Sequence, residues 1–224
     1  MKILALDTST RFLCLGFYDS GKVYEYTLET STRLSGVLTA TIARCLQALG
    51  WGARDIDCFA CGRGPGSFTG VRIGMSVIKG LSWALKKPVV GIPTLDVIAR
   101  NAGNTGGEVI TIVDAKRSLV YCGIYKGMRR IGPYMLLSKE DLLKKLKPGA
   151  LVLGDGLGVF GADIAASGKG CLLLEKDYWF PRPFHLIDAA VERVRRKEQS
   201  DAFRISPVYL YPKECQIRDV KKKK

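Results

Sequence analysis

Residues 62–74 read Gly62-Arg63-Gly64-Pro65-Gly66-Ser67-Phe68-Thr69-Gly70-Val71-Arg72-Ile73-Gly74. The apolar run Ile56 to Cys61 comes directly before this stretch and predicts a buried strand, and Val71 to Lys86 predicts a helix after it. Glycine allows positive φ angles and the close approach of another backbone, and Ser67 and Thr69 are N-cap candidates for the helix. The stretch therefore predicts a strand, a tight turn and a helix.

Anion binding is one role for such a turn, because the free N–H groups of a helix N-terminus attract negative charge. Neither familiar phosphate motif matches: no lysine follows Thr69, as a Walker A loop requires, and the spacing Gly-x-Gly-x-x-Gly is not met. Two interpretations stay open. The turn lets a helix lie close to a sheet, or Gly64, Gly66, Ser67 and Thr69 bind an anion or nucleotide at a subunit junction.

The composition is that of a soluble protein with an acidic partner. The chain has 224 residues, 47% of them hydrophobic, which suffices for one large or two small domains. Its net charge of +14 favours nucleic acid as a partner, although Lys221 to Lys224 form a terminal tail. No run approaches the roughly 20 apolar residues that span a bilayer, and Met1 to Leu6 is too short for a signal peptide. We therefore expect a cytoplasmic protein without a membrane partner.

The seven cysteines lie mostly in apolar runs, which fits a reducing compartment. Cys58 and Cys61 have CxxC spacing, but no second pair follows at the spacing of a zinc ribbon. Within a strand, residues three apart point to opposite faces, so these two side chains could neither form a disulfide nor share a metal. We interpret both as buried thiols.

The order of the predicted elements suggests a duplicated α/β fold with a cleft between its halves. The linker-like stretch 103–107 divides the chain into an N-terminal half, 1–102, and a C-terminal half, 108–224. Each half opens with a strand that ends in an aspartate, Asp7 or Asp114, followed by a hairpin and a helix. The predicted strands are 2–6, 12–18, 22–28, 56–61, 88–92, 109–113, 119–125, 133–137 and 151–153, and the predicted helices are 34–49, 71–86, 94–101, 139–146 and 187–198.

Two of these helices suggest binding surfaces. The helix 34–49 has a single charge, Arg44, and apolar residues on nearly every side, so we expect it to be buried on more than one side or to lie in a protein interface. The helix 71–86 carries Arg72, Lys79 and Lys86 seven residues apart, which forms a basic stripe. That stripe is either an ordinary solvated face or a contact with tRNA phosphates.

Four stretches carry a family resemblance. They are Ile3-Leu4-Ala5-Leu6-Asp7-Thr8-Ser9-Thr10, the glycine-rich stretch 62–74 with Lys79-Gly80-Leu81, Asp114-Ala115-Lys116-Arg117, and Pro207-Val208-Tyr209-Leu210. Together they resemble the bacterial TsaB (YeaZ) family, whose members take part in tRNA threonylcarbamoyladenosine biosynthesis. The resemblance implies an α/β ASKHA fold, as in actin, Hsp70 and sugar kinases, made of two ribonuclease-H-like halves.

The resemblance also implies a function. Members are non-catalytic scaffold subunits that bind and stabilise TsaD, the subunit that transfers the threonylcarbamoyl group to an adenosine of tRNA. The ATPase TsaE is a further partner, the chain alone is expected to form a homodimer, and tRNA is reached through the complex. The first two helices of the family form the dimer surface, which implies these partner-binding residues here: Leu34, Val37, Leu38, Thr41, Ile42, Cys45, Arg72, Met75 and Lys79.

The alternative function is an active ASKHA phosphotransferase that binds ATP, with Asp7 and Asp114 where such enzymes hold Mg²⁺. The phosphate loops of active members read Asp-x-Gly-x-Thr/Ser, and here Ser9 and Lys116 stand at the glycine positions. TsaD holds its metal with a His-x3-His pair, whereas this chain has the single histidine His185. We therefore expect no catalytic residues, no metal and no cofactor.

Overall fold

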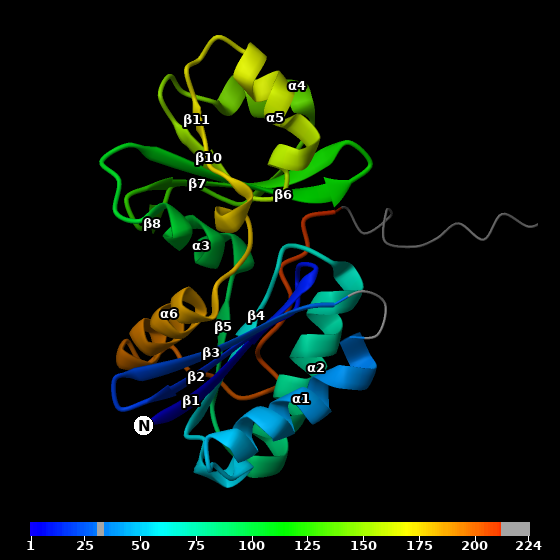
Figure 1. Ribbon diagram of the computed structural model, residues 1–224, viewed down its shortest axis with the longest axis vertical. Helices are drawn as coiled ribbons and strands as arrows, with labels where there is room; N and C mark the ends of the chain where they lie inside the picture. The colour runs from blue at the N-terminus through cyan, green and yellow to red at the C-terminus, as the bar shows by residue number, and fades with distance from the viewer. Residues whose placement is uncertain (31–33, 212–224) are drawn as a thin grey trace, which may run out of the picture.

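The computed structural model describes residues 1–30 and 34–211, and it is built around two β-sheets (Figure 1). The C-terminal lysine run lies outside the described residues. The first sheet has the order β3-β2-β1-β4-β5, with β1 antiparallel to β2 and parallel to β4. Its strands are β1 (Lys2–Asp7), β2 (Phe12–Asp19), β3 (Lys22–Glu29), β4 (Cys58–Gly62) and β5 (Val89–Ile92).

Helices cover both faces of the first sheet. On one face lie α1 (Leu34–Ala48) and α2 (Phe68–Leu85), which share an apolar cluster with Cys61, and on the other lies α6 (Pro183–Arg195), which shares one with Cys58. The two cysteines thus point to opposite faces and are buried, as predicted. Helix α6 begins four residues earlier than predicted because Pro183 at its start fixes a helical φ.

The second sheet has the order β11-β10-β6-β7-β8, and β9 also pairs with β7. Its strands are β6 (Glu108–Lys116), β7 (Leu119–Lys126), β8 (Arg129–Arg130), β9 (Met135–Leu137), β10 (Leu151–Leu153) and β11 (Leu172–Leu173). Helices α4 (Lys139–Lys145) and α5 (Leu157–Ala166) pack on one face, and α3 (Thr94–Ala99) packs on the other. In the described part of the chain, the connections contain three short 3₁₀ helices: Ala53–Asp55, Arg100–Ala102 and Lys176–Tyr178.

The two sheets repeat one topology. In each, the first strand is central, an antiparallel hairpin lies on one side and parallel strands lie on the other, so β6, β7 and β10 correspond to β1, β2 and β4. This agrees with two ribonuclease-H-like halves. Helix α5 stands where α2 stands in the first half, and we did not predict it because Gly158 and Gly161 weaken its helical signal.

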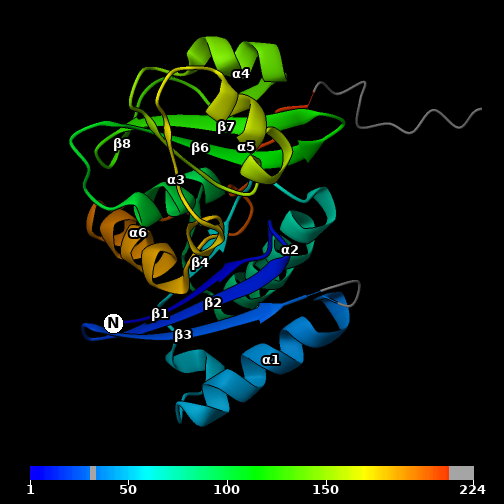
Figure 2. The same cartoon turned by 45° about the horizontal axis from the view of Figure 1, so that its top comes forward.

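Each half also contributes a helix to the region between the sheets (Figure 2). Helix α3 precedes the stretch 103–107, yet Leu95 and Ile98 pack in the cluster of the second sheet. Helix α6 comes from the C-terminal part of the chain and packs on the first sheet. The division into 1–102 and 108–224 stays a prediction. Among the described residues, no helix is both long and apolar enough to cross a membrane.

Candidate functional site: the cleft and the glycine-rich turn

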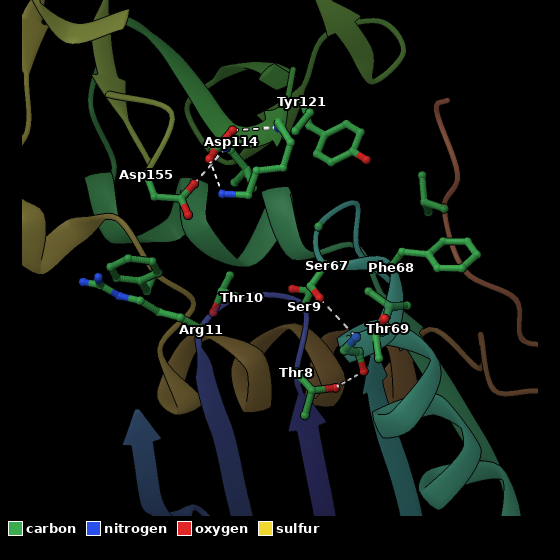
Figure 3. A pocket seen from close by; sticks show the side chains of 18 of the residues that line it. Thr8, Ser9, Thr10, Arg11, Ser67, Phe68, Thr69, Asp114, Tyr121 and Asp155 are labelled. Atoms are coloured by element: carbon green, nitrogen blue, oxygen red, sulfur yellow. Dashed lines mark hydrogen bonds and ion pairs between the residues drawn. The ribbon is translucent and has the colours of Figure 1, made fainter. Parts of the chain in front are cut away.

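A cavity of about 1100 Å³ opens between the ends of β1 and β6. Ser67 and Thr69 of the glycine-rich turn lie on one side, and Asp114 and Asp155 lie on the other (Figure 3). The chain segment 208–211 forms part of the wall. The cavity therefore lies where a duplicated fold places its cleft, at the carboxyl ends of the central strands.

The glycine-rich turn is fixed to the residues that follow β1. The amide of Ser67 donates to the Ser9 carbonyl at 2.7 Å, and Thr8 Oγ1 donates to the Gly70 carbonyl at 2.8 Å. A Cβ added to Gly70 would lie 2.1 Å from the Thr8 oxygen, and one added to Gly66 would lie 2.3 Å from the Ser9 oxygen. These glycines are therefore needed for close packing of the turn and helix, which favours the first of our two interpretations.

The candidate anion site at the start of α2 is only partly open. Ser67 is the N-cap, since its Oγ accepts from the Gly70 amide at 3.2 Å, and Gly66, Ser67 and Thr69 line the cleft. Gly64 is buried behind the turn and is bonded to Thr94, so the structure does not bring it to the cleft. The remaining members of the predicted anion site stay a prediction.

Asp7 is closed off from the cleft. Its Oδ1 accepts from Ser9 N at 2.7 Å and Ser9 Oγ at 2.6 Å, and its Oδ2 accepts from Thr94 Oγ1 at 2.7 Å. A Cβ on Gly62 would lie 2.2 Å from that Oδ2. Burial raises the pKa of Asp7, while the hydrogen bonds from Ser9 and Thr94 oppose the rise. Asp7 is therefore buried away from the cleft, which disfavours the alternative phosphotransferase function, where it would hold Mg²⁺.

Asp114 lies beside the cleft but is occupied by Lys116. Its Oδ1 accepts from the Lys116 amide at 2.7 Å and its Oδ2 from Lys116 Nζ at 2.6 Å. The hydrogen bond and charge of Asp114 raise the pKa of Lys116. Asp155 Oδ1 accepts from Asp114 N at 2.9 Å, and burial raises the pKa of Asp155. The described residues contain no group of three or more histidine, cysteine or acidic side chains placed to hold a metal.

Sequence reasoning missed three residues of the cleft. Arg11 carries its guanidinium 4.7 Å from the ring centre of Phe180, and Asp155 faces the same cavity. Asp155 had a usable signal, because Gly154-Asp155-Gly156 follows β10 as the glycine-rich turn that begins at Arg63 follows β4. Arg11 and Phe180 had none, since only the folded chain brings residues so far apart in sequence together.

The C-terminal segment ties the turn to the second half. Val208 N donates to the Arg63 carbonyl at 2.8 Å, and Tyr211 Oη donates to the Ala115 carbonyl at 2.9 Å. Arg72 Nε donates to Tyr209 Oη at 2.8 Å, and its guanidinium lies 3.7 Å from the ring centre of Phe68. Arg72 is therefore held by its own chain, which leaves Lys79 and Lys86 as the freer members of the predicted basic stripe.

The predicted partner-binding residues do not share one face. Four of them are buried in the first half and offer little or no surface to a partner: Leu38, Thr41, Ile42 and Met75. Arg72 is exposed, and the others are half-buried: Leu34, Val37, Cys45 and Lys79. This distribution of exposure has a simple cause. The apolar side chains of α1 at helical spacing pack on α2 and the sheet, and small residues rather than charges form the exposed side.

We call this exposed side the small-residue face. Its members are Ser35, Gly36, Thr39, Ala40 and Ala43 of α1, and Ser76, Gly80 and Ala84 of α2. Arg44 is the single charged residue of α1, and Trp83 stands exposed at the end of α2. Helix α1 thus has an exposed, nearly uncharged side in the single chain, so of the two predicted alternatives the protein interface stays a prediction.

The chain is similar to proteins named for the threonylcarbamoyladenosine modification of tRNA. A family model described as TsaD: tRNA N6-adenosine threonylcarbamoyltransferase matches residues 28–154, more than half of the chain. The tRNA threonylcarbamoyladenosine biosynthesis protein TsaB of Bacillus subtilis (strain 168) is 28% identical, and the match covers 100% of both chains. TsaB of Escherichia coli (strain K12) is 33% identical, and that match covers 56% of this chain and 55% of the relative.

Solved structures agree with these relatives. YeaZ from Pseudomonas aeruginosa superimposes with a TM-score of 0.82 at 27% identity, and the match covers 93% of this chain and 99% of that one. The actin-like ASKHA fold that the resemblance implied is confirmed by this likeness. Sequence, family model and fold thus agree that the chain belongs to the TsaB (YeaZ) family of tRNA threonylcarbamoyladenosine biosynthesis proteins.

Proposed function

We propose that this chain is a non-catalytic scaffold subunit that binds and stabilises a TsaD-type transferase in the complex forming N6-threonylcarbamoyladenosine on tRNA. Its relatives in Bacillus subtilis and Escherichia coli are named for that biosynthesis. The match to the TsaD family model supports descent from a common ancestor with the transferase. Related chains of one fold can pair through equivalent surfaces about a pseudo-twofold axis.

The small-residue face is the observation that carries the proposal. Ala40 and Ala43 of α1 and Gly80 of α2 are exposed, so a partner helix can approach closely without displacing long side chains. A face with so little charge gains from being covered, because few hydrated groups must lose their water. The same face serves in a homodimer when the chain is alone, and TsaE joins the complex as a further partner.

The state of the two aspartates supports a role without chemistry. Phosphotransfer needs carboxylates that hold the metal ions bridging the phosphates. Asp7 already accepts three hydrogen bonds inside the chain, and Asp114 is neutralised by Lys116 at 2.6 Å. An ATP-dependent phosphotransferase, the alternative function, would have to break both arrangements before it could use the cleft.

A matched pair of variants tests the proposal. Ala40→Arg adds a long charged side chain to the small-residue face, and Ala162→Arg makes the same change on the exposed side of α5. Each variant is mixed with TsaD of the same organism, and complex formation is followed by size-exclusion chromatography with mass detection. We expect wild type and Ala162→Arg to form the complex and Ala40→Arg to lose at least tenfold in affinity.

Two further measurements accompany the pair. Modified adenosine is measured on tRNA with reconstituted components, where Ala40→Arg should fall to the level seen without this chain. ATP turnover is measured on the chain alone, where we expect none. Complex formation by Ala40→Arg equal to that of Ala162→Arg, or ATP hydrolysis by the isolated chain, would overturn the proposal.

A further inference from the structure

A second cavity, of about 620 Å³, lies away from the cleft between α3, α6 and the hairpin of β7 and β8. Both ribbon views place these elements together on the side of the molecule opposite α2 (Figures 1 and 2). We call it the basic groove, because six cationic side chains line it: Arg100, Lys126, Arg129, Arg130, Arg193 and Arg196.

The three carboxylates of the groove already have partners within the chain. Asp96 Oδ1 accepts from Tyr125 Oη at 2.9 Å and from Tyr134 Oη at 2.6 Å. Glu192 Oε2 accepts from Arg100 Nη2 at 2.7 Å. Glu198 forms an ion pair with Arg193 at 3.5 Å. Glu192 and Glu198 are thus paired with arginines, whereas Asp96 is bonded to neutral tyrosines and keeps its charge, so the three carboxylates offset only part of the charge of the six cations.

The remaining cations form no ion pair within the described part of the chain, although, after the hydrogen bond from Arg100, the charge of Arg196 helps to lower the pKa of Glu192. Lys126, Arg129 and Arg196 are exposed, and no acceptor among residues 1–30 and 34–211 contacts their charged groups. Arg130 donates to the Gly132 carbonyl and lies 4.2 Å from the ring centre of Tyr134, so its positive charge is also uncompensated. Holding like charges in one groove costs free energy in the unliganded protein, and an anionic ligand that spans them recovers that cost.

A polymer of phosphates fits this arrangement better than a single small anion. The unpaired cations come from two elements, the β7–β8 hairpin and the end of α6, so a ligand must extend across the groove to reach both. Arginine predominates, and its planar guanidinium binds phosphate oxygens in pairs. Repeated phosphates also release condensed counterions as each cation binds, which adds affinity at each step.

We propose that the basic groove binds the phosphate backbone of RNA. The identity of that RNA as the tRNA substrate rests on the proposed function, which makes tRNA the polyanion that the complex must hold. The groove is a better candidate for this contact than the stripe on α2, where Arg72 is engaged by Phe68 and Tyr209. It also lies apart from the small-residue face, so a bound transferase leaves it open.

Two triple variants test the proposal, each removing three positive charges from exposed positions. The groove variant carries Lys126→Ala, Arg129→Ala and Arg196→Ala. The control variant carries Lys22→Ala, Arg54→Ala and Lys145→Ala, which lie outside the groove. Urea unfolding should show that neither variant is less stable than the wild type, because none of the six side chains is buried.

Binding of a tRNA transcript is measured by filter retention between 50 and 200 mM salt, on the complex with TsaD. We expect the groove variant to bind at least tenfold more weakly and its dependence of log K on log salt to fall by about 2 to 3, at roughly 0.7–0.9 for each lost phosphate contact. The control variant should keep the wild-type slope. Equal affinities and slopes for the two variants would overturn the proposal.

The same variants separate this proposal from the proposed function. If no complex with TsaD forms, the scaffold role has failed, and tRNA and poly(U) binding by the isolated chain then decide the groove alone. An acidic protein is the competing occupant. Loss of polyglutamate binding in the groove variant without any loss of RNA binding would assign the groove to an acidic protein and would also overturn the proposal.

Discussion

The ends of β1 and β6 occupy equivalent places in the two halves, yet the aspartates at these ends differ in burial and in hydrogen bonding. At the end of β1, Asp7 is 1% exposed and accepts hydrogen bonds from Ser9 and Thr94. At the end of β6, the Asp114 side chain is 21% exposed and pairs with Lys116, two residues further along the same strand. One repeated topology has thus produced a closed junction in the first half and an open one in the second.

Glycines allow close backbone packing at both junctions, but only in the first half does a glycine also pack against the carboxylate of the aspartate. A Cβ on Gly70 would lie 2.1 Å from the Thr8 oxygen, and a Cβ on Gly154 would lie 2.1 Å from the Ile112 oxygen. In the first half Gly62 also approaches the carboxylate of Asp7, so the turn seals it. In the second half the equivalent turn contacts Ile112 and leaves Asp114 beside the cleft. Position in the fold therefore sets where an aspartate lies, and local packing sets whether a ligand can reach it.

The largest expected effect comes from breaking the closed junction. Gly70→Ala places a methyl group against the Thr8 carbonyl, which must shift together with β1 or α2, and we expect a loss of about 3 kcal/mol or more in the free energy of unfolding. Gly80→Ala is the control, since its Cβ meets nothing within 4 Å, and it should stabilise α2 by about 0.5–1 kcal/mol. Urea unfolding checks both. Equal midpoints for the two variants would contradict the close contact.

The regular parts of this comparison could be predicted from the sequence. Strand, glycine-rich turn and helix follow from the alternation of apolar runs with glycine, and the two Asp-terminated strands revealed the duplication. The packing of α1 could not be predicted, because Thr41 is buried while Ala40 is exposed and neither has a strong preference. Only contacts with the sheet and α2 decide which side of such a helix faces water.

The closure of Asp7 could not be predicted either. The sequence places Asp7 at the end of a strand, as it does Asp114, and offers no sign that Thr94, 87 residues away, will bond to its carboxylate. The contact between the C-terminal segment and α2 could not be predicted for the same reason, because Tyr209 and Arg72 are 137 residues apart in the sequence. Contacts over such distances depend on the assembled fold and leave no periodic pattern.

The next effect compares the two aspartates directly. Asp7→Ala removes the acceptor of the buried Ser9 amide, and we expect a loss of about 2 kcal/mol. Asp114→Ala removes a partner of a solvent-exposed lysine, and we expect a loss of less than about 1 kcal/mol. Urea unfolding of the two variants at neutral pH measures the difference. A larger loss for Asp114→Ala would reverse our assignment of the closed and open junctions.

The titration of Asp7 should have a smaller effect on the free energy of unfolding, and the direction of this effect with pH can be predicted. Because burial raises the pKa of Asp7 in the folded chain, Asp7 binds more protons there than in the unfolded chain. Its contribution to stability is therefore full below its unfolded pKa, about 3.9, and is lost as pH rises through the higher folded value. Asp7→Asn cannot titrate, so its stability relative to wild type should increase from about pH 4 upward and then level off. Unfolding measured from pH 4 to pH 7 should show this trend, and the opposite trend would mean that the hydrogen bonds outweigh burial.

The smallest expected change in stability concerns the turn between β6 and β7, next to Asp114. Lys116 and Arg117 have φ angles of 66° and 54°, a region that glycine adopts at lower cost. Arg117→Gly should therefore stabilise the chain by about 0.5–1 kcal/mol. Lys116→Gly relieves the same strain but removes the ion pair with Asp114, whose worth at this exposure is about 0–1 kcal/mol, so we expect little net change. The difference between the two variants in thermal unfolding measures the ion pair, and an equal gain in both would mean that Lys116 holds Asp114 without stabilising the fold.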